Sequence, residues 1–399
     1  MQDSKKTNSA LASVTKVAKN YAMYIALAVI FVVFQIMSGG KFLTAFNVTN
    51  LVNQTGYIAV LAVGMTLVLI ICQIDLSVGF LTGFLGACAA RLLLAGVSIP
   101  LTVLIVLVFG ALLGLLQGFI IGKVGVPAFV TTLAGEFAFR GLLTLITQDI
   151  GTINVTSKTF KGISQGFLPA LFKVPLFGKS YHGLTLVIGV LAVAVVIIAN
   201  VRQRNDLRKY KLETGSVAAF VVKNVFFSAL ILALTILLAS YQGISWTVVI
   251  VAAVTAAYHF VLTKTKVGRH IYGMGGNAEA AKLSGVNIKK VLMGIYMSMG
   301  AMAALSGIMI TSRMGCAQPT TGTGYELDAI ASCYIAGVST SGGVGSVINS
   351  VVGAFVIMSL TNGLNLIGVG ISYQYIIKGI IFVVAVAIDV RGRGRKALG

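Results

Sequence analysis

Residues 56–79 read GYIAVLAVGMTLVLIICQIDLSVG, a long apolar run that ends in a polar break. The apolar part approaches the length of about 20 residues that an α-helix needs to cross the hydrocarbon core of a bilayer. Asp75 and Gly79 then fall inside the apolar sequence that follows. A bilayer tolerates such an interruption only where the backbone is buried in protein or borders a water-filled path. The segment therefore predicts a membrane protein with broken helices.

The composition of the whole chain agrees with this prediction. Of its 399 residues, 57% are hydrophobic and 10% are charged, whereas a soluble domain has about 25% charged residues. Similar apolar runs recur near 22–38, 56–72, 76–95, 101–122, 128–147, 183–200, 217–238, 246–263, 292–311, 325–338, 346–363 and 372–389. The predicted fold class is an all-α membrane protein, a polytopic helical bundle of about 12 spans that includes broken and short helices.

The formal net charge of +20 comes mainly from basic residues in the gaps between the apolar runs. They gather before the first run and at 202–211, 264–290 and 391–396. Basic residues beside spans mark the cytoplasmic side of a membrane protein. The pattern therefore indicates that both termini are cytoplasmic and that the basic residues face the headgroups of the lipid bilayer. It argues against nucleic acid as a binding partner.

These segments give the predicted organisation of the chain. Residues 1–21 form a cytoplasmic tail, 22–389 the membrane domain and 390–399 a basic cytoplasmic tail. Within the membrane domain we expect 148–182 to be an extracytoplasmic loop and 264–291 to be a cytoplasmic segment, because the sides alternate from a cytoplasmic N-terminus.

Ionisable and polar residues inside spans are costly, and they commonly face a cavity or one another. The candidates for the translocation path or its gate are Asp75, Ser77, Gly79, Glu136, Arg140, Asp328, Ser339 and Asn362. Simpler structural roles compete with this interpretation. Asp75 can cap the helix that follows it, Glu136 and Arg140 can neutralise each other four residues apart on one helix face, and Asn362 can pair between helices.

Several kinds of chemistry have no counterpart in the sequence. The spans lack the chain of acidic residues and histidines that is typical of a proton-coupled carrier, and the sequence has no phosphate-binding loop of the Gly-x-x-x-x-Gly-Lys-Ser/Thr type. The four cysteines lie in apolar surroundings and resemble packing residues. We therefore expect no enzyme, no cofactor and no metal site.

Residues 273–290, GMGGNAEAAKLSGVNIKK, form a polar insertion between two apolar runs. Asn277 can cap a helix that begins at Ala278, and Glu279 falls in its first turn, where a carboxylate suits the helix dipole. Ala280 and Ala281 favour the helix, and Gly285 ends or bends it. Such a helix could enter a groove on a cytoplasmic partner or lie on the lipid headgroups, and local physics leaves both open.

Residues 268–287, GRHIYGMGGNAEAAKLSGVN, resemble the coupling segment of permease subunits in ATP-binding cassette importers, with its Glu-Ala-Ala…Gly pattern. Three further stretches are similar to the ribose, xylose and galactose branch of monosaccharide permeases. They are LAVGMTLVLIICQIDLSVG, VPAFVTTLAGEFAFRG and the segment that begins YELDAIASCYIAGVSTSGGVGS. The likeness runs in order along nearly the whole chain. Gln73 departs from the Glu or Gly that is usual before Ile-Asp-Leu-Ser, and the long region 183–263 resembles the xylose-type and multiple-sugar permeases.

This resemblance implies a homodimeric permease in a bacterial plasma membrane, with ATPase subunits on the cytoplasmic side and a sugar-binding protein outside. The substrate would be a monosaccharide, such as the pentose xylose. Residues Asn277, Glu279, Ala280, Ala281 and Gly285 would couple the ATPase to the spans. Specificity would lie mostly in the binding protein, and we expect no dense polar and aromatic pocket here. A nucleoside or branched-chain amino acid permease, or an ion-coupled secondary sugar carrier, remains an alternative.

Overall fold

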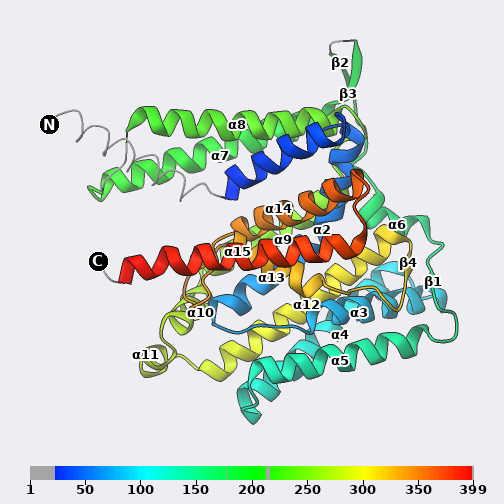
Figure 1. The fold of residues 1–399 in the computed structure, drawn as a ribbon, viewed down its shortest axis with the longest axis vertical. Helices are drawn as coiled ribbons and strands as arrows, with labels where there is room; N and C mark the ends of the chain where they lie inside the picture. Colours follow the sequence, from blue (N-terminus) through cyan, green and yellow to red (C-terminus); the bar gives the residue numbers. More distant parts are fainter. Residues whose placement is uncertain (1–22, 177, 213–215, 398–399) are drawn as a thin grey trace. The chain divides into compact units, whose positions relative to one another are not determined.

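The computed structural model describes residues 23–176, 178–212 and 216–397. Each of the twelve predicted spans is a helix. The first is Met23–Met37, and the others are α2 (Ala45–Ile70), α3 (Val78–Leu94), α4 (Ile99–Phe119), α5 (Ala128–Thr147), α7 (Gly183–Lys209), α8 (Val217–Ala239), α9 (Trp246–Lys264), α12 (Ile288–Met314), α13 (Tyr325–Ile335), α14 (Val347–Leu366) and α15 (Ile371–Ala397) (Figure 1). The predicted fold class, a polytopic helical membrane protein, is confirmed. The predicted tail 1–21 lies outside the described residues.

The helices differ in length, and this separates complete crossings from partial ones. Within the described part of the chain, eight helices are long and apolar enough to cross a membrane. Met23–Met37, Val78–Leu94 and Ile371–Val384 are shorter apolar segments. Helix α13 has 11 residues, which at about 1.5 Å per residue covers only half of a bilayer core.

Shorter elements connect these helices. A π-helical turn, η1 (Ile120–Val124), extends α4, and α6 is Lys158–Gln165. Strand β1 (Ile153–Asn154) pairs antiparallel with β4 (Cys316–Ala317), and β2 (Lys173–Leu176) forms a hairpin with β3 (Lys179–His182). Two short helices, α10 (Lys266–Gly276) and α11 (Ala278–Leu283), lie between α9 and α12. The sequence predicted α11, but it did not predict α10.

The chain forms two compact units. The first comprises Met1–Phe42, Leu51–Gln165 and Thr247–Gly399, and the second comprises Leu43–Asn50 and Gly166–Trp246. In the second unit α7 packs against α8, and Asn200 Nδ2 donates a hydrogen bond to Asn224 Oδ1 at 2.9 Å. The polar pair is satisfied within this helical hairpin, as a polar group between membrane helices must be. All the candidate site residues belong to the first unit.

Helix α12 is central to the first unit, and it packs most extensively against α4 and α3. Glycines make the contact with α4 possible. A methyl group on Gly110 would lie 2.5 Å from Gly300 O and 2.7 Å from Ala304 Cβ, and one on Gly114 would lie 3.0 Å from Gly300 Cα. Small residues at this spacing let membrane helices approach closely, because packing rather than hydrophobic burial holds such helices together.

We expect Gly300→Ala to destabilise the protein. Its methyl group would lie 2.9 Å from Gly114 N and 3.0 Å from Gly110 C, so α4 and α12 would have to separate. Overpacking of this kind costs about 1–3 kcal/mol. Gly294→Ala on the same helix is the control, because nothing lies within 4 Å of the added methyl. Thermal unfolding in detergent measures both variants, and an equal melting temperature for the two would contradict this account of the interface.

Two helices of the first unit begin next to each other. Helix α2 ends at Ile70 and α3 begins only at Val78, whereas α13 follows the connecting segment 315–324. A methyl group on Gly79, near the start of α3, would lie 2.6 Å from Gly322 O and would overlap Glu326 Oε2 at the start of α13. Only glycine fits where these two backbones meet. The N-terminal ends of α3 and α13 are therefore in direct contact.

Candidate functional site

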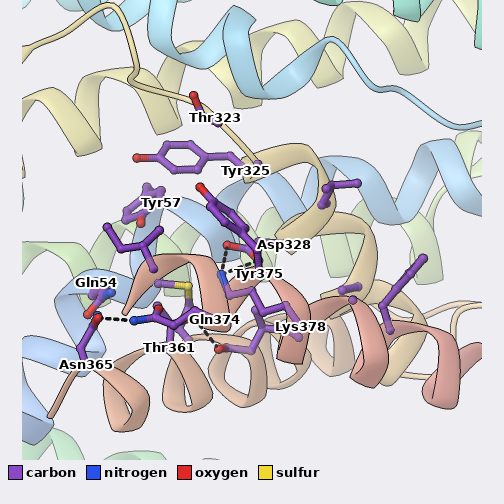
Figure 2. Close-up of a pocket in the computed structure, with 18 residues that line it drawn as sticks. Gln54, Tyr57, Thr323, Tyr325, Asp328, Thr361, Asn365, Gln374, Tyr375 and Lys378 are labelled. Carbon is purple, nitrogen blue, oxygen red and sulfur yellow. Dashed lines mark hydrogen bonds and ion pairs between the residues drawn. The ribbon is translucent and has the colours of Figure 1, made fainter. Parts of the chain in front are cut away.

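A cavity of about 440 Å³ lies in the first unit between α2, α13, α14 and α15 (Figure 2). This volume is within the range of about 300–1,000 Å³ that is usual for sites that bind small molecules. Its polar and aromatic lining consists of Gln54, Tyr57, Thr323, Tyr325, Asp328, Thr361, Asn365, Gln374, Tyr375, Lys378 and Phe382. Asp328 is the one predicted path residue among them.

An ion pair forms part of the wall. Lys378 Nζ on α15 donates to both carboxylate oxygens of Asp328 on α13, each at 2.9 Å. The two side chains are only 20% and 15% exposed. Two charges withdrawn from water need such direct pairing, because each alone would carry a large desolvation penalty. Lys378 was not among the predicted site residues, although a lysine inside an apolar span is itself a signal of function.

Amide and tyrosine side chains supply the other polar groups of the cavity. Gln374 Nε2 donates to Asn365 Oδ1 at 2.7 Å and to Val369 O at 2.8 Å. The rings of Tyr57 and Tyr325 lie 5.0 Å apart, and Figure 2 shows Tyr375 close to Tyr325. The expectation that the chain has no dense polar and aromatic pocket is therefore wrong. The pocket was not visible in the sequence because four separate segments contribute to it.

Asp75 and Ser77 lie together at the break between α2 and α3. Ser77 N–H and Ser77 Oγ both donate to Asp75 Oδ1, at 2.9 and 2.6 Å. Gln117 Nε2 on α4 donates to Ser77 Oγ at 2.8 Å. Asp75 is 1% exposed, so its carboxylate is held within the protein immediately before the helix that the sequence predicted. The residues do not line the cavity described above.

The predicted neutralising pair of Glu136 and Arg140 does not form. Within the described residues the ion pairs are Lys378–Asp328 and Arg91–Asp149. The guanidinium of Arg140 instead lies over the ring of Phe80 on α3, 5.5 Å from its centroid. A cation over an aromatic face is attracted by the ring quadrupole, so packing between α5 and α3 directs this side chain away from the carboxylate one turn earlier.

Ser339 and Asn362 are both buried, at 2% and 8% exposure. Ser339 N–H donates to Val344 O at 2.9 Å, and Ser339 Oγ accepts from Ser341 N–H at 3.1 Å, so the loop 339–344 folds back on itself. Neither residue lines the cavity. The predicted path residues are therefore distributed over five places. Asp328 lines the cavity, Asp75, Ser77 and Gly79 lie around the break before α3, and Glu136 and Arg140 lie on α5. Ser339 lies in the loop before α14, and Asn362 lies on α14 itself.

The local structure predicted for the polar insertion is confirmed. Helix α11 runs from Ala278 to Leu283, and Asn277 Oδ1 accepts a hydrogen bond from Ala280 N–H at 2.9 Å. Glu279 is in the first turn. Gly285 has a φ of +85°, and Val286 N–H donates to Ala281 O at 3.0 Å. This left-handed glycine ends the helix and satisfies one of its last carbonyls.

The outer surface of α11 carries an exposed leucine. Leu283 is 90% exposed, whereas Ala281 on the same helix is 7% exposed and faces the protein. A single exposed apolar side chain is common on protein surfaces, so it is the position of Leu283 on the predicted coupling helix that makes it a candidate for a contact with a partner. Leu283 was not among the predicted coupling residues, because the pattern of the segment does not indicate which face of the helix is outward.

Residues 47–386 match the family described as "Branched-chain amino acid transport system / permease component". The chain is 38% identical over 370 residues to the xylose transport system permease protein of Haemophilus influenzae, covering 92% of this chain and 95% of that protein. It is 37% identical to the Escherichia coli K12 protein of the same name, covering 92% and 91%. It is 32% identical over 365 residues to the Escherichia coli K12 ribose import permease protein, covering 92% of each. No solved structure matches the chain.

Proposed function

Because the chain belongs to the family of branched-chain amino acid transport system permease components, we propose that it is the membrane subunit of an ATP-driven importer for a monosaccharide. The observation that carries the substrate class is the likeness to proteins named as xylose and ribose permeases along 92% of the chain. The identity is higher to the xylose proteins, so a pentose such as xylose is the proposed substrate. ATP hydrolysis belongs to a separate ATPase subunit.

The chemistry of the cavity supports a sugar. Tyrosine offers an apolar ring face for the C–H groups of a sugar and a hydroxyl for its edge. The amides of Gln54, Asn365 and Gln374 offer donors and acceptors for sugar hydroxyl groups. We therefore propose that the cavity at Asp328 borders the translocation path. The break at Asp75, Ser77 and Gly79, the α5 residues Glu136 and Arg140, and the polar residues Ser339 and Asn362 remain candidates for its gate.

The shape of the first unit supports the proposed partners and sides. In Figure 1 α10 and α11 lie at the same end of this unit as the end of α15, and α6, β1 and β4 lie at the other end. Basic residues occupy 264–290 and 391–396, which favours the cytoplasm for that end. Here α11 would dock on the ATPase through Asn277, Glu279, Ala280, Ala281 and Gly285. A binding protein would deliver the sugar at the other end, and a homodimer would complete the permease.

A second candidate substrate is a branched-chain amino acid, which the name of the matching family favours. Uptake into vesicles tests both substrates. The permease is reconstituted with its ATPase and its binding protein, and each is omitted in turn. We expect uptake of labelled D-xylose only when both partners and ATP are present. Uptake of leucine in place of xylose would establish the second candidate, and uptake by the permease alone under an ion gradient would refute an ATP-driven importer.

We expect Gly285→Val to reduce uptake by about tenfold while the protein still inserts into the membrane. A β-branched residue at a φ of +85° costs about 1–2 kcal/mol, and 1.4 kcal/mol corresponds to a factor of 10. The end of α11 would relax into another conformation and misplace the docking helix. Gly285→Asn is the matched control, because asparagine tolerates the left-handed region. Nothing outside the neighbouring residues lies within 4 Å of a Cβ added here, so the expected strain comes from the backbone conformation.

A further inference from the structure

Three segments of the first unit touch through glycines beside α11. They are the end of α2, the end of α10 and the loop 336–346 between α13 and α14. Gly343 N–H donates to Ile70 O at 2.8 Å. A methyl group on Gly275 would lie 2.7 Å from Gly343 N and would overlap Ile70 O. We call Gly275, Gly342 and Gly343 the glycine junction, because backbone atoms of the three segments contact one another directly there.

Gly342 is required at the junction for two reasons. Its φ is +75°, a conformation that residues with a Cβ rarely adopt. A methyl group on it would also lie 2.7 Å from Gly275 O and 2.8 Å from Ile70 O. The loop therefore reaches α2 and α10 at the same time only with glycine at this position.

Two side chains reinforce the contact. Tyr272 Oη on α10 donates to Gly345 O of the loop at 2.8 Å. Cys72, which follows α2, has a φ of +58°, and its Sγ lies 3.7 Å from Gly275 O. The positive φ turns the chain sharply after α2 and brings the thiol against the end of α10.

The segments that meet here lead to different parts of the proposed machinery. Asn277 is the one residue between α10 and α11. Beyond Cys72 the chain reaches Asp75 and then α3, while the loop contains Ser339 and connects α13 to α14. The junction thus connects α11 to the break before α3 and to the loop that follows α13. The N-terminal ends of α3 and α13 meet at Gly79.

We propose that the glycine junction is the rigid link through which a movement of α11 reaches the break before α3 and the loop before α14. Tyr272 and Gly275 are its positioning residues. The proposal rests on the proposed function of α11 as the ATPase-docking helix. Backbones in contact have no rotamers that could absorb a displacement, and close-packed interiors transmit strain. Coupling between distant sites requires a contiguous physical connection of this kind, with an element that both sites can bias.

The first test compares two adjacent glycines. Gly275→Ala inserts a methyl group into the junction, whereas Gly276→Ala places one where nothing lies within 4 Å. In reconstituted vesicles with the ATPase and binding protein, we expect Gly275→Ala to lower the D-xylose transported per ATP hydrolysed by at least about tenfold, a change of ~1.4 kcal/mol in coupling. ATPase binding should stay unchanged, and Gly276→Ala should match the wild type. An unchanged ratio for Gly275→Ala would overturn the proposal.

The second test uses the wild-type chain, so it does not depend on how a variant folds. Cys72 is an exposed thiol at the junction. Its alkylation by N-ethylmaleimide is followed by mass spectrometry of the Cys72 peptide, with the complex nucleotide-free or trapped with ATP and vanadate. Because a rigid link moves as one body, we expect Cys72 to keep its contacts and the two alkylation rates to agree within about threefold. A rate at least about tenfold higher in one state would show that the junction opens, and it would overturn the proposal. If the proposed function itself is wrong, wild-type vesicles instead show no ATP-dependent uptake.

Discussion

Leu283→Asp is expected to abolish ATP-dependent uptake while the permease remains in the membrane at its normal level. Leu283 is 90% exposed at the end of α11 and contacts little of its own chain, so its removal costs the folded permease almost nothing. A buried apolar anchor at a protein interface contributes about 2 kcal/mol or more. Its replacement by a charged residue should therefore weaken ATPase binding by at least about 30-fold.

The matched control for this variant is Leu212→Asp. Leu212 is 57% exposed and lies in the connection between α7 and α8. The basic residues at 202–211 predict that this connection is cytoplasmic, as α11 is. Binding of the detergent-solubilised permease to immobilised ATPase measures the affinity directly. If both variants bind as the wild type does, Leu283 is not an anchor and α11 does not dock through this face. If both lose binding equally, the effect is one of added negative charge.

Lys378→Met is expected to have the second large effect, on stability and on uptake together. Loss of one partner of a buried ion pair costs about 3–5 kcal/mol, because the other charge is left unpaired in a poorly solvated place. Asp328 would be that charge, on the wall of the cavity. We expect Asp328→Asn alone to be destabilising as well, since an amide keeps one acceptor oxygen but leaves Lys378 without its countercharge and without one of its two 2.9 Å contacts.

The double variant Asp328→Asn with Lys378→Met separates the pair from its two members. Replacement of both charges together often costs little stability, so its melting temperature should recover toward that of the wild type. Uptake should stay low, because the cavity has lost both charged groups. A double variant whose loss of stability equals the sum of the single losses would show that the two side chains do not stabilise each other.

The sequence predicted the helices well because their signal is local. Each span is a run of apolar residues, and α11 is bounded by an asparagine and a glycine whose conformational preferences act over a few residues. Helix α10 was missed for a related reason. Its buried positions Gly268, Ile271 and Gly275 follow a helical spacing, but the glycines carry no hydropathy that a search for apolar periodicity would detect.

The site was harder to predict because it depends on contacts between distant segments. Asp328 was identified, but its partner Lys378 is fifty residues away on another helix. Glu136 and Arg140 have the spacing of an ion pair, yet the ring of Phe80 attracts the arginine instead. The spacing of residues along a helix indicates which ion pairs are possible. The packing between helices determines which of them form. A lone lysine in the apolar sequence of α15 was the available signal for the missing partner.

The meeting of the α3 and α13 N-terminal ends at Gly79 and Gly322 has an electrical consequence. The start of a helix carries about half of a positive elementary charge, and here two such ends are in contact. In some membrane channels, the positive ends of half-helices exclude protons and cations. A membrane potential of 100 mV stores about 2.3 kcal/mol per elementary charge, and a leak of sodium ions or protons would dissipate it. Two carboxylates, Asp75 just before α3 and Glu326 in the first turn of α13, lie at these ends and offset part of this charge. We therefore expect the replacement of both acids by amides to strengthen the barrier to cations without affecting the passage of an uncharged solute.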